Sequence, residues 1–472
     1  MLIINSLFKS KKRNNETMKA RRSNRKITPF GGVIPVLKQI RDFKIPSLIR
    51  ESLGTRVKQA KYGYEDVIIA WMLTNLCGGI RLDHITKLRK NLNIIPELSL
   101  PSHDTLGRVM KSLATDVLSE SEVHRGKRGY QESKRVGSKT YKRITTRETN
   151  DNEPMNDLLA LITSKIGLLK QNEKYDLDLD VTAIYTEVRE AKKSYKQRRC
   201  FAPMVACIDN LPVYIEMRNG NVSPGARILE STQKCIENLE KNKISIGCVR
   251  MDRGAYHGPT FDYLHKKDIH FVVGARKSKK IMEVLNTTED AKWTPVHIQT
   301  SLYDWDCETT DYEWQLNGSK ENYRLVVLRM DRRRDTAKKG RYGTTPKTWI
   351  YGGQYAYKMI ITNDKTSSAK ELVEFYNQRG TSERNFDTMK NDFGWKLPPF
   401  SNMSENTVFL IIAAITNNVY QAVIRKLKKK VKEIRLNSRL RDFIYMFMSV
   451  ACELTDTEYV FYDTNIAYEK IC

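Results

Sequence analysis

The stretch YNQRGTSE (residues 376–383), followed seven residues later by Lys390, carries the most information about the fold of this chain. At about 100° per residue, a helix brings four of its side chains within about 60° of one another: Tyr376, Arg379, Glu383 and Lys390. A solvent-facing helix with mixed charges is the simple alternative. The order of the four residue types is more specific than their composition. Whether further carboxylates lie upstream therefore decides between a functional site and an ordinary helix surface.

A first acidic segment, DLDLDVT (residues 176–182), alternates aspartates with apolar residues. This period of two predicts a β-strand with all three aspartates on one face. Like charges on a buried strand face repel one another and lose hydration. A bound cation offsets that cost, whereas an exposed edge strand avoids it, and both readings stay open at this point.

A second acidic segment, MDRGAY (residues 251–256), ends a short apolar strand and leads through a glycine turn into a helix. Side chains at the carboxyl ends of strands open into the crevice where α/β sheets bind ligands. Asp252 is therefore either a ligand in such a crevice or the cap of its turn.

Together, these segments resemble the DDE transposases of bacterial insertion sequences, the cut-and-paste group with a ribonuclease H-like core. The order Tyr-x2-Arg-x3-Glu-x6-Lys resembles the signature around the third acidic residue of that family. The Asp-x-Thr that closes the first segment resembles its first motif, which favours Asp180 as a ligand, with Asp178 as the rival. Asp-Arg-Gly-Ala-Tyr is similar to the second motif, although Ala255 separates the glycine from the aromatic residue.

The resemblance implies that Asp180, Asp252 and Glu383 hold two Mg²⁺ ions, for which Mn²⁺ can substitute. Asp180 would bridge the two ions, and the other two carboxylates would each complete one site. Two such ions activate water or a 3′-hydroxyl and stabilise the leaving oxygen. The implied reactions are DNA strand cleavage and strand transfer.

The same family pattern gives roles to basic and aromatic residues. Arg379 and Lys390 would grip DNA phosphates, the first bidentately and the second as a point charge. Tyr376 would pack on a sugar or donate to a phosphate. Trp305 and Trp314, in the tryptophan-rich segment 277–356, are candidates for stacking on a flipped base, with a core position as the alternative.

The net charge of +26 and the isoelectric point near 9.6 favour a polyanionic partner. Lys and Arg gather in three runs, at residues 9–26, 125–148 and 425–441, with nine in each. This pattern favours nucleic acid over a membrane surface. We expect double-stranded DNA as the partner (terminal inverted repeats and target DNA), bound by a homodimer across two paired ends.

Nothing in the sequence predicts a membrane protein or a disulfide framework. The longest apolar run, residues 408–415, is shorter than the roughly eighteen residues of a membrane span. The eight cysteines form no CxxC motif and no zinc-finger spacing, as expected for reduced thiols. We therefore expect a cytoplasmic, nucleoid-associated protein.

The predicted architecture is an α/β ribonuclease H-like catalytic core with a β-rich insertion, preceded by a helical DNA-binding region and followed by a basic helical tail. In the helical region, a helix capped at Ser102 carries Arg108 and Lys111 and suits a helix-turn-helix reader or a plain helical bundle. The expected segments are a disordered basic arm (1–30), helical region (31–118), basic linker (119–153), core (154–276 and 357–420), β-rich insertion (277–356) and tail (421–472).

Three other functions fit parts of this pattern. A non-catalytic DNA-binding repressor, or an inactive transposase derivative, explains the charge but not the three carboxylates. A metal-dependent nuclease without strand transfer shares all three ligands. A two-carboxylate glycoside hydrolase leaves both the charge and the Tyr-Arg-Glu-Lys spacing unexplained.

Overall fold

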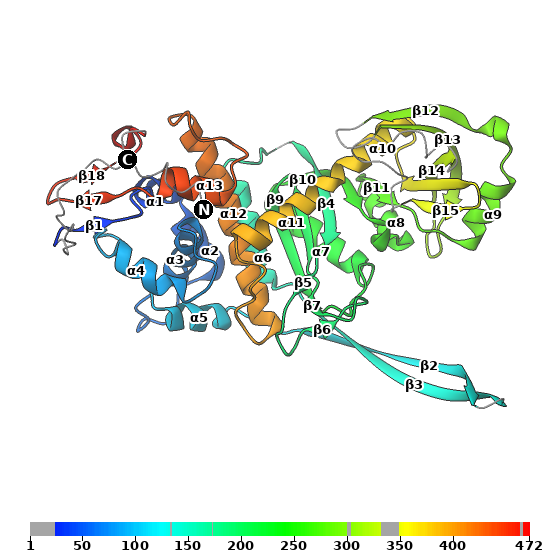
Figure 1. The fold of residues 1–472 in the computed structure, drawn as a ribbon, viewed down its shortest axis with the longest axis horizontal. Helices are drawn as coiled ribbons and strands as arrows, with labels where there is room; N and C mark the ends of the chain where they lie inside the picture. The colour runs from blue at the N-terminus through cyan, green and yellow to red at the C-terminus, as the bar shows by residue number, and fades with distance from the viewer. Residues whose placement is uncertain (1–23, 133–134, 172, 300–303, 332–348, 463–465) are drawn as a thin grey trace, which may run out of the picture.

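The computed structural model describes residues 24–132, 135–171, 173–299, 304–331, 349–462 and 466–472. Figure 1 shows an elongated molecule with a helical half at one end, a large twisted sheet in the middle and a β-rich region at the other end. A long β-hairpin leaves the sheet and extends away from the body.

The middle of the molecule is built on five neighbouring strands of a twelve-stranded sheet, in the order β9-β8-β4-β10-β11. β4, β10 and β11 are parallel to one another, and β8 and β9 are antiparallel to their neighbours. Asp209 and Asn210 form the turn between β8 and β9, with Asp209 in the left-handed region at φ 52°. These strands are Lys174–Val181 (β4), Met204–Ile208 (β8), Leu211–Arg218 (β9), Ser245–Met251 (β10) and His270–Gly274 (β11).

Both faces of this sheet are covered, because its strands alternate between two apolar clusters. Met204 and Ala206 of β8 belong to the cluster that contains helices α7 and α8, whereas Val205 belongs to the cluster that contains α6 and α12. In β4, Leu177 and Leu179 pack on the α7 side, so the aspartates between them face the opposite side. The four helices are Glu153–Lys165 (α6), Ile228–Lys241 (α7), Gly258–Lys266 (α8) and Met403–Lys428 (α12).

The segment expected as a β-rich insertion continues the same sheet. β14 pairs with β16, and β16 pairs with β11, so hydrogen bonding runs unbroken from the middle of the molecule to its β-rich end. Its elements are Lys279–Thr287 (α9), Thr294–Gln299 (β12), Asp304–Gln315 (β13), Asn322–Asp331 (β14), Ile350–Gly352 (β15) and Tyr355–Thr362 (β16).

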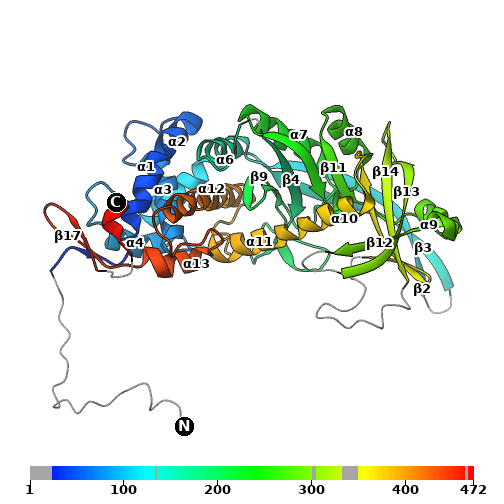
Figure 2. The same ribbon diagram turned by 90° about the horizontal axis from the view of Figure 1, so that it is seen from above.

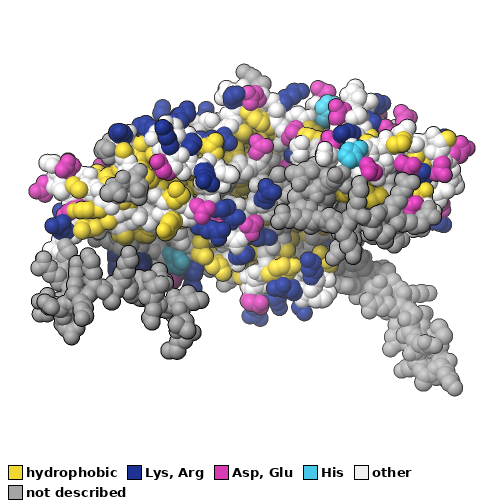
Figure 3. All heavy atoms as spheres, turned by 45° about the horizontal axis from the view of Figure 1, so that its top comes forward, with side chains coloured by type: hydrophobic (Ala, Val, Ile, Leu, Met, Phe, Trp, Pro, Cys, Tyr) yellow, Lys and Arg dark blue, Asp and Glu magenta, His cyan; other side chains and the backbone are white. Residues whose placement is uncertain are grey.

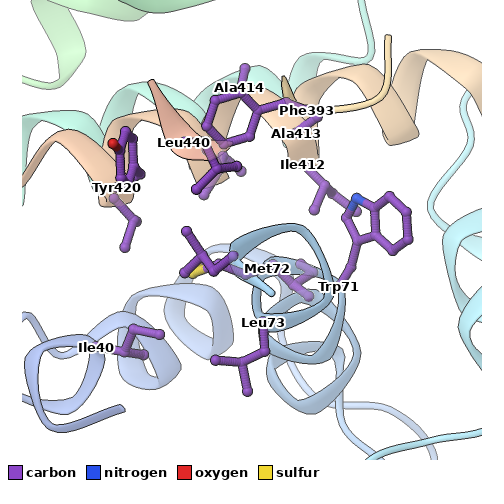
Figure 4. Close-up of a cluster of buried hydrophobic side chains, with 14 of the residues drawn as sticks. Ile40, Trp71, Met72, Leu73, Phe393, Ile412, Ala413, Ala414, Tyr420 and Leu440 are labelled. Atoms are coloured by element: carbon purple, nitrogen blue, oxygen red, sulfur yellow. The ribbon is translucent and has the colours of Figure 1, made fainter. Parts of the chain in front are cut away.

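The helical half shares one core with the sheet, through α12. Figure 4 shows side chains of α3 and α12 packed against one another, and the Trp71 and Phe409 rings lie 5.4 Å apart. Ser102 caps the predicted helix by accepting from the Thr105 backbone N–H, which confirms that capping prediction. The helices of this half are Val33–Asp42 (α1), Ile45–Leu53 (α2), Tyr64–Leu76 (α3), His84–Leu92 (α4) and His103–Ser112 (α5).

Helix α12 is longer and more apolar than the sequence suggested. It spans 26 residues, and by length and composition it is the one described helix that could cross a membrane. All of its most apolar 18-residue window is buried by protein, which is the pattern of a core helix.

Two segments differ from the expected organisation. Residues 119–153 were expected to be a linker, but most of them form the long hairpin of Leu118–Glu132 (β2) and Arg135–Asn150 (β3), which joins the sheet beside β9. The expected helical tail (421–472) is helical at its start, where α12 continues to Lys428. Its described residues beyond that point form the short helical turns Leu440–Phe443 (α13), Ile444–Met448 (η5) and Tyr468–Lys470 (η6) and the strands Cys452–Leu454 (β17) and Tyr459–Phe461 (β18).

The first described strand pairs with a strand near the C-terminus, and Figure 2 shows β17 and the C-terminus at the outer end of the helical half. β17 pairs with Ile27–Thr28 (β1), inside the segment expected as a disordered arm, and the three strands form a small sheet beside the helical half. Residues 1–23 of that arm lie outside the described residues.

Candidate active site

Asp180 and Asp252 lie side by side at the carboxyl edge of the central sheet. The parallel strands β4 and β10 pair Asp178 with Arg250 and Leu179 with Met251, so the next position on each strand is one of the two aspartates. Neighbouring strands are about 4.8 Å apart. Burial raises the pKa of the Asp180 carboxyl, Arg379 opposes this, and the charge of Asp252 raises the pKa further.

Arg379 supplies the positive charge in contact with Asp180. Its Nη1 donates to Asp180 Oδ2 at 2.8 Å, and the Val181 backbone N–H donates to Oδ1 at 2.8 Å. The Nε of Arg379 is buried and has no acceptor among the described residues. The guanidinium can therefore hold Asp180 and still donate to a further oxygen atom.

Asp252 caps the turn that follows β10. Its Oδ1 accepts from the Gly254 backbone N–H at 2.7 Å, at the start of the 3₁₀ turn Arg253–Ala255 (η1). Capping and ligation were alternatives in the sequence, but the two roles are compatible here. The cap fixes the orientation of the carboxylate, and Oδ2 has no donor within the described parts of the chain.

Asp178, the rival first ligand, is committed to an ion pair. Its two carboxylate oxygens accept from Arg250 Nε and Nη2 at 2.7 and 2.9 Å, and only 3% of the residue is exposed. Arg250 also donates to the Phe375 carbonyl and lies over the Phe375 ring. Asp178 thus joins two strands and a helix.

The predicted stripe of four side chains is broken by a change of helical pitch. Ala369–Asn377 (α10) is followed by the 3₁₀ turn Gln378–Gly380 (η4) and then by Thr381–Asp392 (α11). A 3₁₀ turn rotates about 120° per residue rather than 100°. Lys390 still reaches the β4 end, where its Nζ donates to Thr182 Oγ1 at 2.6 Å, whereas Glu383 is exposed to solvent.

The donor set fits a divalent cation in part. Asp180 and Asp252 are two neighbouring carboxylates, and their repulsion is the kind that a bound cation relieves. Glu383 stands outside the pair, in the first turn of α11. Among the described residues, no three His, Cys, Asp or Glu side chains are close enough to form a metal site as they stand.

A comparison with family models identifies the chain. The model described as "Transposase DDE domain group 1" matches residues 10–458. The chain belongs to the DDE transposases. No curated protein sequence matches it significantly. One similar solved structure is titled "Cryo-EM structure of piggyBac transposase synaptic complex with hairpin DNA"; it is 12% identical, covers 88% of this chain and 80% of its own, and has a TM-score of 0.37.

In this member of the DDE transposases, Tyr376 closes one side of the carboxylate pair. Burial raises the pKa of its phenol, and the charge of Asp252 adds to the rise while Arg379 opposes it. The hydroxyl lies against Gly274 at the end of β11, where an added Cβ atom would come within 2.7 Å of it. Glycine at position 274 is therefore what allows the phenol to approach the sheet.

Replacing Gly274 with alanine should push Tyr376 away from the carboxylates. Overpacking of this kind costs about 1–3 kcal/mol, so we expect both a lower denaturation midpoint and slower DNA cleavage. Gly107→Ala is the matched control, because its Cβ would meet only ordinary contacts at 3.8 Å and beyond. In a Tyr376→Phe background, the added methyl group should cost less than in the wild type, as a double-mutant cycle would show. If Gly274→Ala costs as much stability in the Tyr376→Phe background as in the wild type, the added methyl group does not clash with the Tyr376 hydroxyl.

Lys358 is a site residue that the sequence analysis missed. Its Nζ donates to Asn377 Oδ1 and lies 5.2 Å from the centre of the Tyr376 ring and 5.4 Å from that of Trp305. Burial, together with the charge of Arg379, lowers the pKa of this lysine to about 7. A lone lysine within the apolar strand YAYKMIIT (355–362) was the available signal.

The lowered pKa of Lys358 predicts a pH-dependent stability. Between pH 7 and about 10.5 the unfolded chain binds a proton that the folded chain does not, so the free energy of unfolding rises with pH in this window. Below pH 7 both states are protonated and the burial penalty is constant. The stability of Lys358→Met relative to wild type should be greatest near pH 6 and should fall toward pH 10, as chemical denaturation would measure. An exposed control, Lys266→Met, should show no such trend.

The remaining predicted residues occupy different settings. Trp305 is only 8% exposed and packs edge-to-face on Trp349 at 5.2 Å, so it is a core residue that cannot receive a stacked base. Trp314 is half-buried, and the Lys280 ammonium lies 5.1 Å from the centre of its ring.

The two basic residues of α5 lie opposite the buried face of that helix. Leu106, Val109 and Met110 are buried, whereas Arg108 and Lys111 are exposed. Lys111 lies 3.7 Å from Glu405 at the start of α12, so part of its charge is already neutralised within the protein.

Proposed function

We propose that this chain is an insertion-sequence transposase that binds transposon ends and catalyses DNA strand cleavage and strand transfer. The pair formed by Asp180 and Asp252 at the carboxyl edge of β4 and β10 carries the proposal, because α10–α11 brings Arg379 and Lys390 to that same edge. The strand order β9-β8-β4-β10-β11, with three antiparallel strands followed by two parallel crossovers, supports a ribonuclease H-like core.

Asp180 and Asp252 would hold Mg²⁺, or Mn²⁺ in its place. When bound, two such ions supply an activated water or 3′-hydroxyl and stabilise the leaving oxygen. The cap on Asp252 keeps its carboxylate in one orientation, and the bond from Arg379 does the same for Asp180. Preorganised ligands of this kind lower the cost of assembling the reactive arrangement.

The basic side chains would bind the DNA backbone around this centre. Arg379 uses Nη1 on Asp180, and the guanidinium has further N–H groups that could donate to a phosphate oxygen. Lys390 holds its ammonium beside Thr182, two residues beyond Asp180. Charge-assisted hydrogen bonds to phosphate are among the stronger polar contacts. These residues would place the scissile phosphate over the two carboxylates.

A groove with several basic side chains lies between the helical half, the loop after α11 and a second three-stranded sheet. The strands of this sheet are Ile184–Tyr185 (β5), Lys192–Lys193 (β6) and Arg199–Phe201 (β7). The Arg198 guanidinium stacks 4.1 Å from the centre of the Tyr185 ring at the wall of the groove. Figure 3 shows Lys and Arg side chains spread over the helical half and the middle of one face, with Asp and Glu more frequent at the β-rich end. The basic residues that line the groove are Arg81, Lys193, Arg198, Arg199 and Lys396.

We propose that Glu383 completes the metal site when DNA is bound. It lies three residues after Gly380, directly beyond the 3₁₀ turn that carries Arg379, so a small change of pitch there re-aims it. Cleavage of a linear DNA that carries this gene's own flanks, with Mg²⁺, tests the proposal. Wild type should cut at defined ends, and Glu383→Gln should bind those ends without cutting. Equal cutting by both proteins would exclude Glu383 as a ligand.

The exposed position of Glu383 also favours a second candidate, a DNA-binding repressor or inactive transposase derivative. In that case, wild type and Glu383→Gln should both bind the flanks specifically, and neither should cut. A nuclease without strand transfer would cut but would not join the freed 3′-hydroxyl to target DNA. For the active enzyme we propose a homodimer across two paired ends, working on DNA in the cytoplasm.

A further inference from the structure

The β2–β3 hairpin is a long two-stranded ribbon that joins the described body of the molecule at its root. Fifteen cross-strand pairs join Leu118–Glu132 to Arg135–Asn150. Within the described residues, only Thr149 and Asn150 pair with a strand of the body, β9. Figure 1 shows the two strands running away from the sheet. An isolated two-stranded ribbon is marginally stable in water, so its length calls for a partner.

The root of the hairpin is held firmly by the body. Asn150 is buried, and its Nδ2 donates to the carbonyl oxygens of Thr115 and Asp116 at 3.1 and 2.8 Å. The acidic residues near the root have partners in the body: Asn219 donates to Glu148, and Arg227 forms an ion pair with Glu120. The direction in which the ribbon leaves the sheet is therefore set by the fold.

Beyond the root, the register brings like charges together. Arg125 pairs directly opposite Lys142, and Arg128 directly opposite Lys139. The two pairs stand three positions apart in this register. Like charges directly opposite one another destabilise an antiparallel pair. Residues 125–147 contain nine Lys or Arg and Glu132 as their one acidic residue.

We propose that the β2–β3 hairpin is a DNA-binding arm that lies in the major groove of duplex DNA. Phosphates on both walls of the groove would neutralise the cations that the register sets opposite one another, and the groove is wide enough for a two-stranded ribbon. Residues 121–132 extend about 40 Å at about 3.3 Å per residue, which exceeds one turn of duplex DNA, about 34 Å. The inference rests on the proposed function, since it takes DNA as the partner.

The test removes the opposed charges and keeps the strands. A full-length variant combining Arg125→Thr, Arg128→Thr, Lys139→Thr and Lys142→Thr replaces them with a good strand-forming residue. We expect it to be at least as stable as wild type, yet to bind duplex DNA more than about tenfold more weakly at physiological salt. The slope of log affinity against log salt should fall by about 3 to 4.

A matched control removes four cations elsewhere. Lys241→Gln, Lys243→Gln, Lys266→Gln and Lys267→Gln lie just before β10 and β11, at the edge of the sheet opposite the carboxylate pair. This variant should keep the affinity and nearly all of the salt slope of the wild type. An arm variant that binds duplex DNA like the control overturns the inference.

Two further readouts separate the possible failures. If the arm variant changes the oligomeric state in sedimentation while its DNA affinity stays the same, the ribbon binds a second copy of the chain and the inference is wrong. Cleavage of the gene's flanks by wild type decides the proposed function independently of the arm. Specific cutting together with unchanged binding by the arm variant would reject the arm alone.

Discussion

Asp180→Asn should abolish DNA cleavage and leave DNA binding nearly intact. Loss of a ligand removes several kcal/mol of transition-state stabilisation, which is about a thousandfold or more in rate. The amide keeps the shape of the side chain, and its one oxygen can still accept from either Arg379 Nη1 or the Val181 N–H. Cleavage of end-labelled linear DNA and a gel-shift assay would measure the two activities. Asp252→Asn should behave in the same way.

Asp176→Asn is the matched control for this experiment. Asp176 lies on the same face of β4 and is exposed, and its distance along the strand removes it from the carboxyl edge. It should cut at close to the wild-type rate. Retained cleavage in Asp180→Asn would mean that the first ligand is misassigned.

Asp178→Asn should chiefly destabilise the protein. Breaking a buried ion pair by removing one charge costs about 3–5 kcal/mol, because the other charge is left uncompensated. Arg250 would then lose its counter-charge and one of its two short bonds, because the Nδ2 of asparagine cannot accept a hydrogen bond. The midpoint of chemical denaturation should fall sharply, and cleavage measured at low temperature should persist in the fraction that remains folded.

A double substitution distinguishes structure from catalysis at this pair. Asp178→Leu combined with Arg250→Met replaces both charges with apolar side chains and should recover much of the lost stability, as seen when buried ion pairs are replaced together. Recovery of stability without recovery of cleavage would show that Asp178 also serves the chemistry.

The sequence predicted the elements of the site better than their contacts. The alternating aspartates, the Asp252 turn and the helix with Arg379 and Lys390 were all visible as local patterns. The role of Asp178 was not, because its partner Arg250 lies 72 residues away and meets it only through the register of β4 and β10. The prediction that Glu383 and Arg379 share one helix face assumes a single uniform helix. The 3₁₀ turn at residues 378–380 contradicts that assumption.

The structure differs most from the sequence-based expectations in segments that lack a regular apolar pattern. The basic segment 119–153 looked like a linker because glycines and cations interrupt it, yet cross-strand hydrogen bonds and the anchoring at Asn150 make it a hairpin. Trp305 could not be separated from Trp314 by sequence, since burial depends on neighbours such as Trp349 that come from another strand region. Family membership is well supported by the match over residues 10–458, and the third ligand stays a prediction.

Because β1 pairs with β17, the small terminal sheet cannot form until most of the chain has been synthesised. Thr28 leaves the ribosome early, but its strand partner Cys452 follows 424 residues later. At about 5–20 residues per second, this interval is roughly 20–85 seconds. Throughout that time the small terminal sheet lacks two of its three strands, and α12, which fills the core of the helical half, is also made late. The helical half can thus reach its final form only when translation is nearly finished, so a nascent or prematurely terminated chain would lack the completed fold.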